Sequence, residues 1–285
     1  MNNQKIKLHD IPEEFNLKIP KKLVNYSVAL GRVRNNDPRT FRILGSGTLV
    51  QKAGKYGILT AHHCLHDINP ELTLGTLNSD VLVCVIKRNQ TVIIKNYEIS
   101  EQPLAGPANR RYGQDGPDIT FIDIPNGPRL STFKAVSSFW NLDIDANKVN
   151  EEFVMHGDIL VNSGFPEENY KIETVNNLIF SKVRLMAFIS DMSDCHIEDI
   201  DGWDYIKSDC NYMRAQGRPR SFAGLSGGGI WSIKLKFNET TKEWDIHDFA
   251  LIGMTFYESP IENDARFLRG HFIDSIYNRA WNNSK

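Results

Sequence analysis

The sequence predicts an all-β protein made of two antiparallel β units. Short β-rich segments, each ended by clusters of Gly, Pro, Asn or Asp, recur along most of its 285 residues. No helical pattern of about 10–15 residues separates them, which argues against the alternating strands and helices of a parallel sheet. Antiparallel barrels or a sandwich remain, and the length suits one or two domains.

The first β unit is expected at residues 23–128, after an N-terminal arm at 1–22. Its β-rich segments are LVNYSVAL, FRILGSGTLV, YGILTA, VLVCVI, TVIIKNYEI and DITFIDI. Residues 129–150 begin after the turn sequence PNGP and end in the polar run DIDANKVN. Such a composition is typical of a connection, so we expect this segment to join the two units.

The second β unit is expected at residues 151–270, and a helix at 271–285 follows it. The β-rich segments of this unit are FVMHGDILVNSGFP, NLIFSKVRLMAFI, GGGIWSIKLKF, WDIHDFALIGMTFY and ARFLRGH. The terminal segment instead has apolar residues at helical spacing, namely Ile273, Ile276, Tyr277, Ala280 and Trp281. One face of this helix is therefore apolar, and we expect it to pack on the second unit.

Charge and hydropathy exclude several classes of protein. The chain carries 33 Lys and Arg against 35 Asp and Glu, a formal charge of −2, whereas nucleic-acid binders are usually basic. Its N-terminal region lacks the apolar run of a secretory signal peptide, and no apolar run reaches the roughly 18 residues of a spanning helix. Four scattered cysteines fit free thiols in a reducing compartment. We therefore expect a cytoplasmic protein that binds neither nucleic acid nor a membrane.

The segment most informative about chemistry is GLSGGG, which places Ser226 inside a glycine-rich turn before an apolar strand. Glycines allow backbone N–H groups to converge on one point. The amides of Gly224 and Ser226 would then stabilise the oxyanion that forms when a hydroxyl attacks a carbonyl. Taken alone, the segment is weak evidence, because a glycine-rich turn that holds a passive serine is the commoner explanation of such a pattern.

A serine nucleophile needs a base, and the base needs an acid that orients it. His63 lies in LTAHHC at the end of an apolar segment, and Asp118 lies in GPDITFI at the start of another. The candidates therefore occur in the order His, Asp, Ser. Between them lie spacings of 55 and 108 residues.

These three segments resemble the signature segments of the chymotrypsin/trypsin-like serine peptidases. TAHHC resembles their TAAHC, PDITFI resembles their DIALL, and GLSGGG resembles their GDSGGP. The two spacings are also of the size expected in that family. With the C-terminal helix, the resemblance covers residues 23–282.

The resemblance implies two six-stranded antiparallel β-barrels and a C-terminal helix. His63 and Asp118 from the first barrel and Ser226 from the second would meet in the cleft between them. Ser226 would attack the scissile carbonyl, His63 would take and return the proton, and Asp118 would orient His63. Amides of Gly224 and Ser226 would form the oxyanion hole. We therefore expect a serine endopeptidase that needs no cofactor or metal and cleaves protein or peptide substrates at limited sites.

The sequence departs from the secreted members of the family at two positions. Gly45 stands where they have a cysteine that pairs with the one matching Cys64, so Cys64 should be a free thiol. Leu225 stands where they carry the aspartate that pairs with a newly cut N-terminus. We therefore expect no activation by N-terminal cleavage, as in intracellular bacterial-type members. Regulation, where present, would act through loops or the oxyanion hole on binding a protein activator.

Two readings of substrate specificity stay open. Arg220 matches the pocket-base position, where a buried guanidinium would suit an acidic P1 side chain, although a solvated loop arginine is the alternative. Glu258 follows the expected pocket-wall residues Phe256 and Tyr257, and its charge would instead favour a basic P1 side chain.

Other chemical sites fit the sequence less well. The His/Cys segment at 62–66 lacks a second ligand pair at zinc spacing, and a calcium-like pattern that starts at Asp143 has Lys148 in the glycine position. A one-residue shift of the alignment would exchange His63 with His62. The acidic stretch at 191–210 is expected to be a solvated loop.

Two alternative functions remain beside the peptidase. The first is a peptidase fold that has lost its chemistry and serves as a protein-binding module. The second is a serine esterase with the α/β-hydrolase fold, because Gly224, Ser226 and Gly228 also fit its G-x-S-x-G pattern. That fold requires the acid and the histidine after the serine, so the chain order argues against the esterase.

Overall fold

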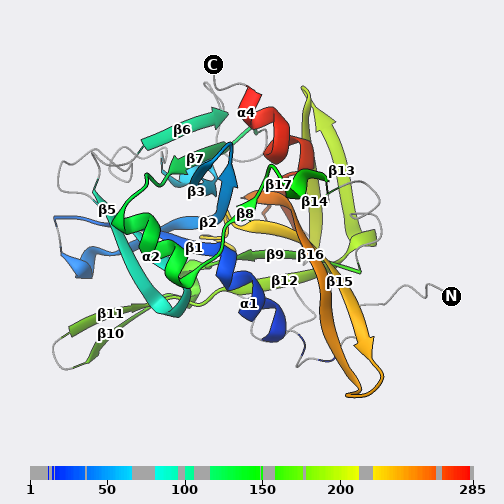
Figure 1. Cartoon of the computed structure of the whole chain (residues 1–285), viewed down its shortest axis with the longest axis horizontal. Coiled ribbons are helices and arrows are strands. Elements are labelled where there is room, and N and C mark those ends of the chain that lie inside the picture. The colour runs from blue at the N-terminus through cyan, green and yellow to red at the C-terminus, as the bar shows by residue number, and fades with distance from the viewer. Residues whose placement is uncertain are drawn as a thin grey trace.

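A computed structural model of the chain confirms an all-β protein with two antiparallel sheets and a short C-terminal helix (Figure 1). The structure describes residues 12, 15, 17–35, 37–65, 81–95, 100–105, 116–147, 149, 158–175, 178–211, 221–260 and 265–282. Most of the expected N-terminal arm lies outside these residues. Antiparallel sheets also rule out the α/β-hydrolase fold, which is built on a mostly parallel sheet.

The first sheet is formed between residues 27 and 141. Its strands are β1 (Ser27–Val33), β2 (Arg42–Lys52), β3 (Lys55–Thr60), β4 (Val81–Ile86), β5 (Gln90–Lys95), β6 (Ser100–Ala105), β7 (Ile119–Asp123) and β8 (Trp140–Asn141). The antiparallel order is β5-β4-β1-β2-β3-β7-β6, and the two-residue β8 pairs parallel to β2. Eight strands are therefore present instead of the six expected. The additional ones, β6 and β8, are a polar strand that contains Pro103 and a very short one.

The second sheet is formed between residues 159 and 271. Its strands are β9 (Ile159–Gly164), β12 (Met186–Asp191), β13 (Cys195–Ile200), β14 (Trp203–Asn211), β15 (Gly229–Asn238), β16 (Glu243–Glu258) and β17 (Ala265–His271). They lie in the antiparallel order β12-β9-β15-β16-β17-β14-β13. Strands β10 (Lys171–Val175) and β11 (Leu178–Lys182) form a separate ladder. This sheet has seven strands, one more than expected.

The expectation of a solvated loop at 191–210 is wrong. This stretch forms most of the hairpin β13–β14, and β14 pairs with β17 inside the second sheet. Asp201 and Gly202 connect the strands, and both have positive φ, as a two-residue hairpin turn requires. Trp203 and Tyr205 are buried, while the acidic side chains of β13 face outward or lie at half-buried positions. Only alternate side chains of an antiparallel strand face the core. Trp203 and Tyr205 can therefore be buried while the outward-facing side chains of the hairpin are acidic.

The chain also contains helices that the sequence analysis did not predict. They are α1 (Lys18–Leu23) and α2 (Pro128–Val136), which lies in the segment expected to be a simple connection. Pro128 suits the first position of a helix, and Leu130 and Phe133 bury one side of α2. Short 3₁₀ turns include η3 (Val24–Tyr26), η4 (Pro38–Thr40), η5 (His62–Cys64), η6 (Lys87–Asn89), η8 (Asp145–Asn147), η9 (Glu167–Asn169) and η10 (Met192–Asp194).

The predicted C-terminal helix is present as a π-helical turn, η12 (Ser275–Arg279), followed by α4 (Ala280–Asn282). It does not pack on the second unit alone. Tyr277 donates its hydroxyl to the Leu251 carbonyl in β16 and accepts a hydrogen bond from Trp140 Nε1 in β8. Trp281 packs edge-on against Phe121 of β7 at 5.2 Å. The helix therefore joins the two sheets.

An aromatic cluster forms the centre of the core between the sheets. Tyr26, Trp140, Trp231 and Phe249 contact one another with every pair of ring centroids 5.5–6.0 Å apart. Trp231 is fully buried, and its Nε1 donates to Ser163 Oγ at 3.1 Å. Residues of both sheets belong to this one core, so the sheets are expected to unfold together.

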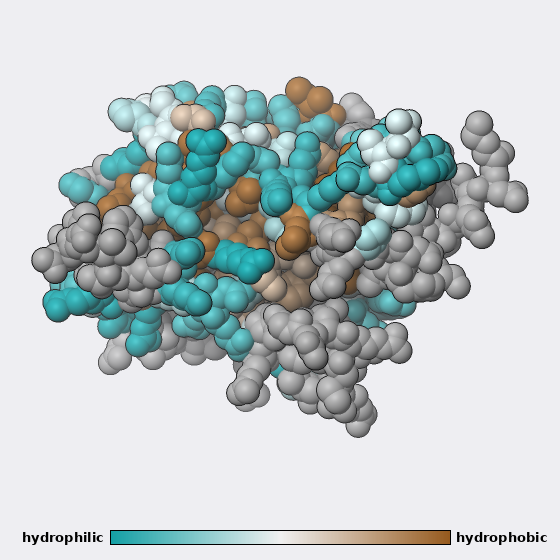
Figure 2. All heavy atoms as spheres, turned by 90° about the horizontal axis from the view of Figure 1, so that it is seen from below, coloured by the Kyte–Doolittle hydropathy of each residue, from teal (hydrophilic) through white to brown (hydrophobic). Residues whose placement is uncertain are grey.

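The surface is mixed in character. Figure 2 shows hydrophilic residues over much of one face, with hydrophobic residues exposed in its middle. No helix in the described ranges is long and apolar enough to cross a membrane.

Trp231→Ala should lower the free energy of unfolding by about 3–5 kcal/mol, because it removes a fully buried indole and leaves a cavity between the sheets. Urea denaturation followed by tryptophan fluorescence and by far-UV circular dichroism measures the change. Ile144→Ala is the control, since Ile144 is 71% exposed, and it should cost less than about 0.5 kcal/mol. Equal losses in the two variants would contradict a shared core centred on Trp231.

Candidate active site

The positions of His63 and Asp118 follow from the pairing of two neighbouring strands. Strands β3 and β7 are antiparallel, with Thr60 opposite Thr120. His63 lies in the 3₁₀ turn η5 shortly after β3 ends, and Asp118 directly precedes β7. The end of one strand therefore meets the beginning of the other, which brings together two residues separated by 55 positions.

Asp118 holds His63 through two hydrogen bonds. His63 Nδ1 lies 2.5 Å from Asp118 Oδ2, and the His63 backbone N–H donates to Oδ1 at 3.0 Å. The Asp118 side chain is only 3% exposed, whereas that of His63 is 26% exposed. With its proton on Nδ1, the imidazole has a lone pair on Nε2, which is the atom a general base needs.

Behind Asp118 lies a second histidine, which the sequence analysis did not place in the site. His271 at the end of β17 is fully buried, and its Nε2 accepts the backbone N–H of Asp118 at 3.0 Å. Its ring lies 4.8 Å from that of Phe256 and 5.2 Å from that of Tyr205. Burial lowers the pKa of His271 to about 3, so this ring is neutral near pH 7. The second sheet thus fixes a group of the first.

The Ser226 turn presents two backbone amides without acceptors. Gly224 and Gly227 have φ of +94° and +86°, so the chain reverses twice around Ser226. Amides of the surrounding residues all donate to protein acceptors, and these residues are Ser221, Phe222, Ala223, Leu225, Gly227 and Gly228. Only Gly224 and Ser226 of this turn have amides with no acceptor among the described residues. These are the two amides that the sequence analysis assigned to an oxyanion hole.

Ser46 of β2 holds this turn against the first sheet. Its hydroxyl donates to the Gly224 carbonyl at 2.6 Å, and its backbone N–H donates to the Ser226 carbonyl at 2.7 Å. These two bonds fix the Gly224–Leu225 and Ser226–Gly227 peptide planes. Ser46 is fully buried and was not among the predicted site residues.

Cys64 lies between the histidine and serine segments. Its Sγ is 3.9 Å from His63 Nε2 and donates to the Ser226 carbonyl at 3.4 Å, so His63 and Ser226 flank the same thiol. The cysteine is free, as predicted, and a Cβ atom on Gly45 would overlap its sulfur. The Ser226 hydroxyl itself donates to the Phe256 carbonyl at 3.4 Å.

The predicted specificity residues are only partly described. Phe256 and Glu258 lie on β16 beside the turn, and Phe256 is buried. Glu258 accepts the Phe222 backbone N–H at 2.9 Å and forms an ion pair with Arg266. Its charge is therefore already matched. Arg220 lies outside the described residues.

Metal binding finds no support in the part of the chain that the structure describes. No group of three His, Cys, Asp or Glu side chains there is placed to hold an ion. Positions 66 and 148, which entered the two metal patterns of the sequence, lie outside the described residues.

Opposing effects act on the two charged groups of the pair. Burial lowers the pKa of His63, but the neighbouring Cys64 sulfur and the Asp118 carboxylate outweigh it and hold the pKa well above 6.5. Burial raises the pKa of Asp118, but the hydrogen bond and charge of His63 outweigh it and bring the pKa below its usual 3.8. Asp118 is therefore ionised throughout the neutral range.

Comparisons with known proteins add little to this geometry. No family model and no curated protein matches the chain. A matching solved structure belongs to work on aromatic interactions in the coupled folding and binding of the intrinsically disordered VPg protein of Sesbania mosaic virus. The match covers 89% of this chain and 88% of the other, with 13% identity and a TM-score of 0.40. This low similarity carries no conclusion about activity.

Gly227→Ala should destabilise the protein by more than about 3 kcal/mol, because the added methyl would overlap the Ser46 carbonyl oxygen and Thr60 Oγ1. Gly54→Ala is the matched control: its φ is also positive, at +77°, but no atom lies within 4 Å of the added Cβ. It should cost only the conformational penalty of about 1–2 kcal/mol. Urea denaturation of both variants gives the comparison, and equal losses would show that the turn is not closely packed.

The His63 ring should titrate in NMR spectra with a midpoint above pH 6.5, and Asp118→Asn should lower that midpoint because it removes the charge that stabilises the imidazolium. Asp123→Asn, at the other end of β7, should leave it unchanged. His271 should show no titration between about pH 5 and 9, because burial holds its pKa at about 3. An unperturbed His63 midpoint, or one insensitive to Asp118→Asn, would contradict the ion pair.

The same shifts set the pH dependence of stability. The folded pKa of His63 lies above its unfolded value, so its contribution is complete below about pH 6.5 and is lost as the pH rises through the folded pKa. For Asp118 the folded pKa is depressed, so its contribution is present above about pH 3.8 and is lost as the pH falls through the folded pKa.

Proposed function

We propose that the protein is a cytoplasmic serine endopeptidase with a chymotrypsin-like fold, which cleaves protein or peptide substrates through Ser226, His63 and Asp118. The observation that carries this proposal is the turn around Ser226, in which the only amides without acceptors in the described turn are those of Gly224 and Ser226. Free N–H groups that flank a serine suit the oxyanion of an acyl-transfer reaction. The resemblance of the His63, Asp118 and Ser226 segments to peptidase motifs supports the same assignment.

The reaction follows from the roles of these groups. Ser226 Oγ attacks the scissile carbonyl carbon, and its proton passes to His63 Nε2. The two free amides donate to the resulting oxyanion, and Asp118 stabilises the imidazolium. His63 then gives the proton to the leaving amine, which departs and leaves an acyl group on Ser226. Water hydrolyses that ester by the reverse proton transfers. Because the pKa of His63 is raised, hydrolysis should increase as the pH rises through that pKa.

A small side-chain movement is part of this proposal. The Ser226 hydroxyl donates to the Phe256 carbonyl, and His63 Nε2 lies near Cys64 Sγ. Rotation of the serine side chain transfers its hydroxyl from the carbonyl towards the imidazole. Catalytic hydrogen bonds in unliganded enzymes are often long and shorten when substrate binds.

Packing around Leu225 supports an enzyme without a zymogen step. Leu225 is 1% exposed and lies in an apolar cluster with Phe188, Phe222 and Leu268. This cluster supplies the anchor that an ion pair with a new N-terminus provides in the secreted peptidases. The turn is therefore held without proteolytic activation, and any regulation by a protein activator would act on an already folded turn.

The ion pair of Glu258 bears on specificity. Arg266 and the Phe222 amide already compensate its charge, so the side chain offers little attraction to a basic P1 residue. Glu258 therefore gives no basis for a basic P1 preference, and the acidic preference assigned to Arg220 remains a prediction.

A fluorophosphonate probe should form a single covalent adduct with the wild-type protein, seen by intact mass, because the probe reacts with activated serines. Ser226→Ala should abolish the adduct, and His63→Ala should slow labelling by at least about 100-fold. Two controls should label normally: Ser131→Ala on the exposed side of α2 and His62→Ala beside the base.

The outcomes separate the alternatives. Normal labelling of Ser226→Ala would overturn the nucleophile, and loss of labelling in His62→Ala but not in His63→Ala would shift the base by one residue. If the wild-type protein forms no adduct, alone or in cell extract, the binding-module alternative replaces the peptidase.

A further inference from the structure

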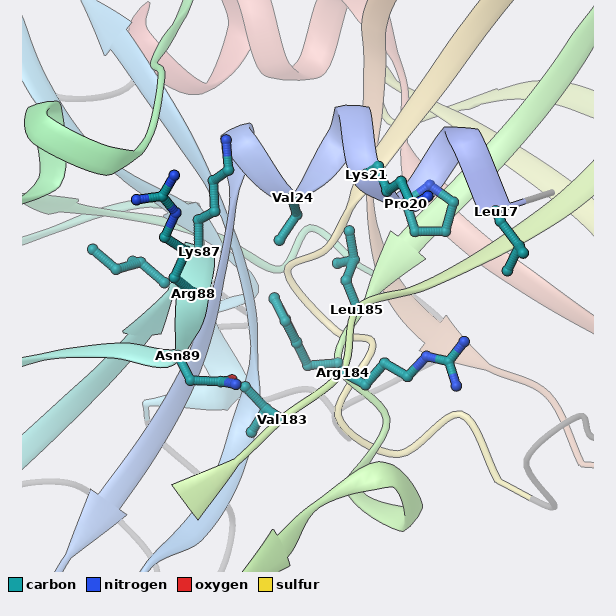
Figure 3. Close-up of a pocket in the computed structure, with 12 residues that line it drawn as sticks. Leu17, Pro20, Lys21, Val24, Lys87, Arg88, Asn89, Val183, Arg184 and Leu185 are labelled. Atoms are coloured by element: carbon teal, nitrogen blue, oxygen red, sulfur yellow. The ribbon is translucent and has the colours of Figure 1, made fainter. Parts of the chain in front are cut away.

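A cavity of about 350 Å³ lies away from the candidate catalytic residues. It is formed by α1, the turn η6, the segment at 183–185 between β11 and β12, and Phe165 (Figure 3). None of His63, Asp118 and Ser226 lines it. Its volume falls within the range of about 300–1,000 Å³ that is common for small-molecule sites.

The interior of this cavity is apolar. Val24, Ile86, Phe165, Val183 and Leu185 contribute to its lining. Figure 3 shows Val24 and Leu185 in the middle of the view, between Lys87 and Arg88 on one side and Arg184 on the other. Leu17, which also lines the cavity, is 54% exposed. A ligand with an apolar body would remove this surface from water.

Basic residues surround the apolar interior. Lys21, Lys87, Arg88 and Arg184 line the cavity, and no acidic residue among those that the structure describes does. Lys87 donates to Asn25 Oδ1 at 2.6 Å, whereas the other three cations have no ion-pair or hydrogen-bond partner within the described ranges. The whole chain has a formal charge of −2, so this cluster is a local exception.

The basic groups come from separate segments of the chain. Figure 3 shows Lys87 and Arg88 on one side of the cavity and Arg184 on the other. Arg88 and Asn89 both have positive φ, an uncommon conformation for consecutive residues that are not glycine. This conformation turns the chain sharply between β4 and β5, at the edge of the cavity.

We propose that this cavity is a binding site for a small amphiphilic anion, with an apolar body and one carboxylate or phosphate head group. The body would lie against Val24 and Leu185, and the head group would bind Arg88 or Arg184, because guanidinium groups bind both kinds of anion. The proposal does not rest on the proposed peptidase activity, since none of the catalytic groups lines the cavity.

The proposal is tested by isothermal titration with decanoate, decyl phosphate and decanol below their aggregation concentrations. At least one anion should bind at least tenfold more tightly than the neutral alcohol. Tighter binding of decanoate would identify a carboxylate ligand, and tighter binding of decyl phosphate a phosphate ligand. Shortening the chain of the preferred anion should weaken binding about fourfold for each methylene removed.

Variants assign the binding to the cavity. Arg88→Glu/Arg184→Glu should weaken anion binding at least tenfold, whereas Lys55→Glu/Lys236→Glu makes the same charge change at exposed positions outside the cavity and should not. If the double variant proves poorly folded, Arg184→Gln replaces it. This milder change should also weaken anion binding, by a smaller factor. The proposal is overturned if neither anion binds, if decanol binds equally well, or if the cavity variants bind like the control.

Discussion

The Asp118 carboxylate is the group on which the arrangement of the candidate site depends. A buried charge is costly unless hydrogen bonds replace its water, and Asp118 receives two of them from His63. Its own backbone N–H is bound by His271, which belongs to the other sheet. Asp118 thus has its carboxylate hydrogen-bonded by His63 beside the first sheet and its backbone N–H hydrogen-bonded by His271 of the second. The orientation of His63 therefore depends on how the two sheets pack, and so on the aromatic core and the C-terminal helix that join them.

In the Ser226 turn the backbone amides and carbonyls named above are hydrogen-bonded within the protein, except for the two amides that would bind an oxyanion. Ser46 binds the carbonyls of Gly224 and Ser226, and the Gly227 amide binds the Thr255 carbonyl of β16. The two remaining amides cannot turn away, because the carbonyls of their own peptides, those of Ala223 and Leu225, accept the Glu167 and Gly228 amides. Both residues are only half-buried, so the two amides lie where an incoming anion could accept their hydrogen bonds.

Much of this could be predicted from sequence, and the failures have identifiable causes. Strands with apolar faces were found, and the triad candidates followed from three short motifs. Strand β6 was missed because it contains a proline and polar residues, and β13–β14 because acidic side chains hide the buried Trp203 and Tyr205. The Asp201-Gly202 pair was a visible hairpin signal there. His271 could not be assigned, because its contact with Asp118 spans 153 positions and depends on the packing of β17. The basic cavity likewise joins segments that no local pattern connects.

Phe165 connects the cavity to the candidate site through a short series of contacts. Its side chain lines the cavity, and its backbone N–H donates to Ser46 Oγ at 2.8 Å. The same hydroxyl donates to the Gly224 carbonyl, which belongs to the peptide next to one of the two free amides. Closely packed interiors transmit small displacements, so a shift of Phe165 would alter the geometry of the Ser46 hydroxyl and with it the Gly224 peptide plane. Any free energy of coupling between the cavity and the turn is reciprocal, so a ligand that changes the affinity of the turn for an anion would have its own affinity changed by the same factor.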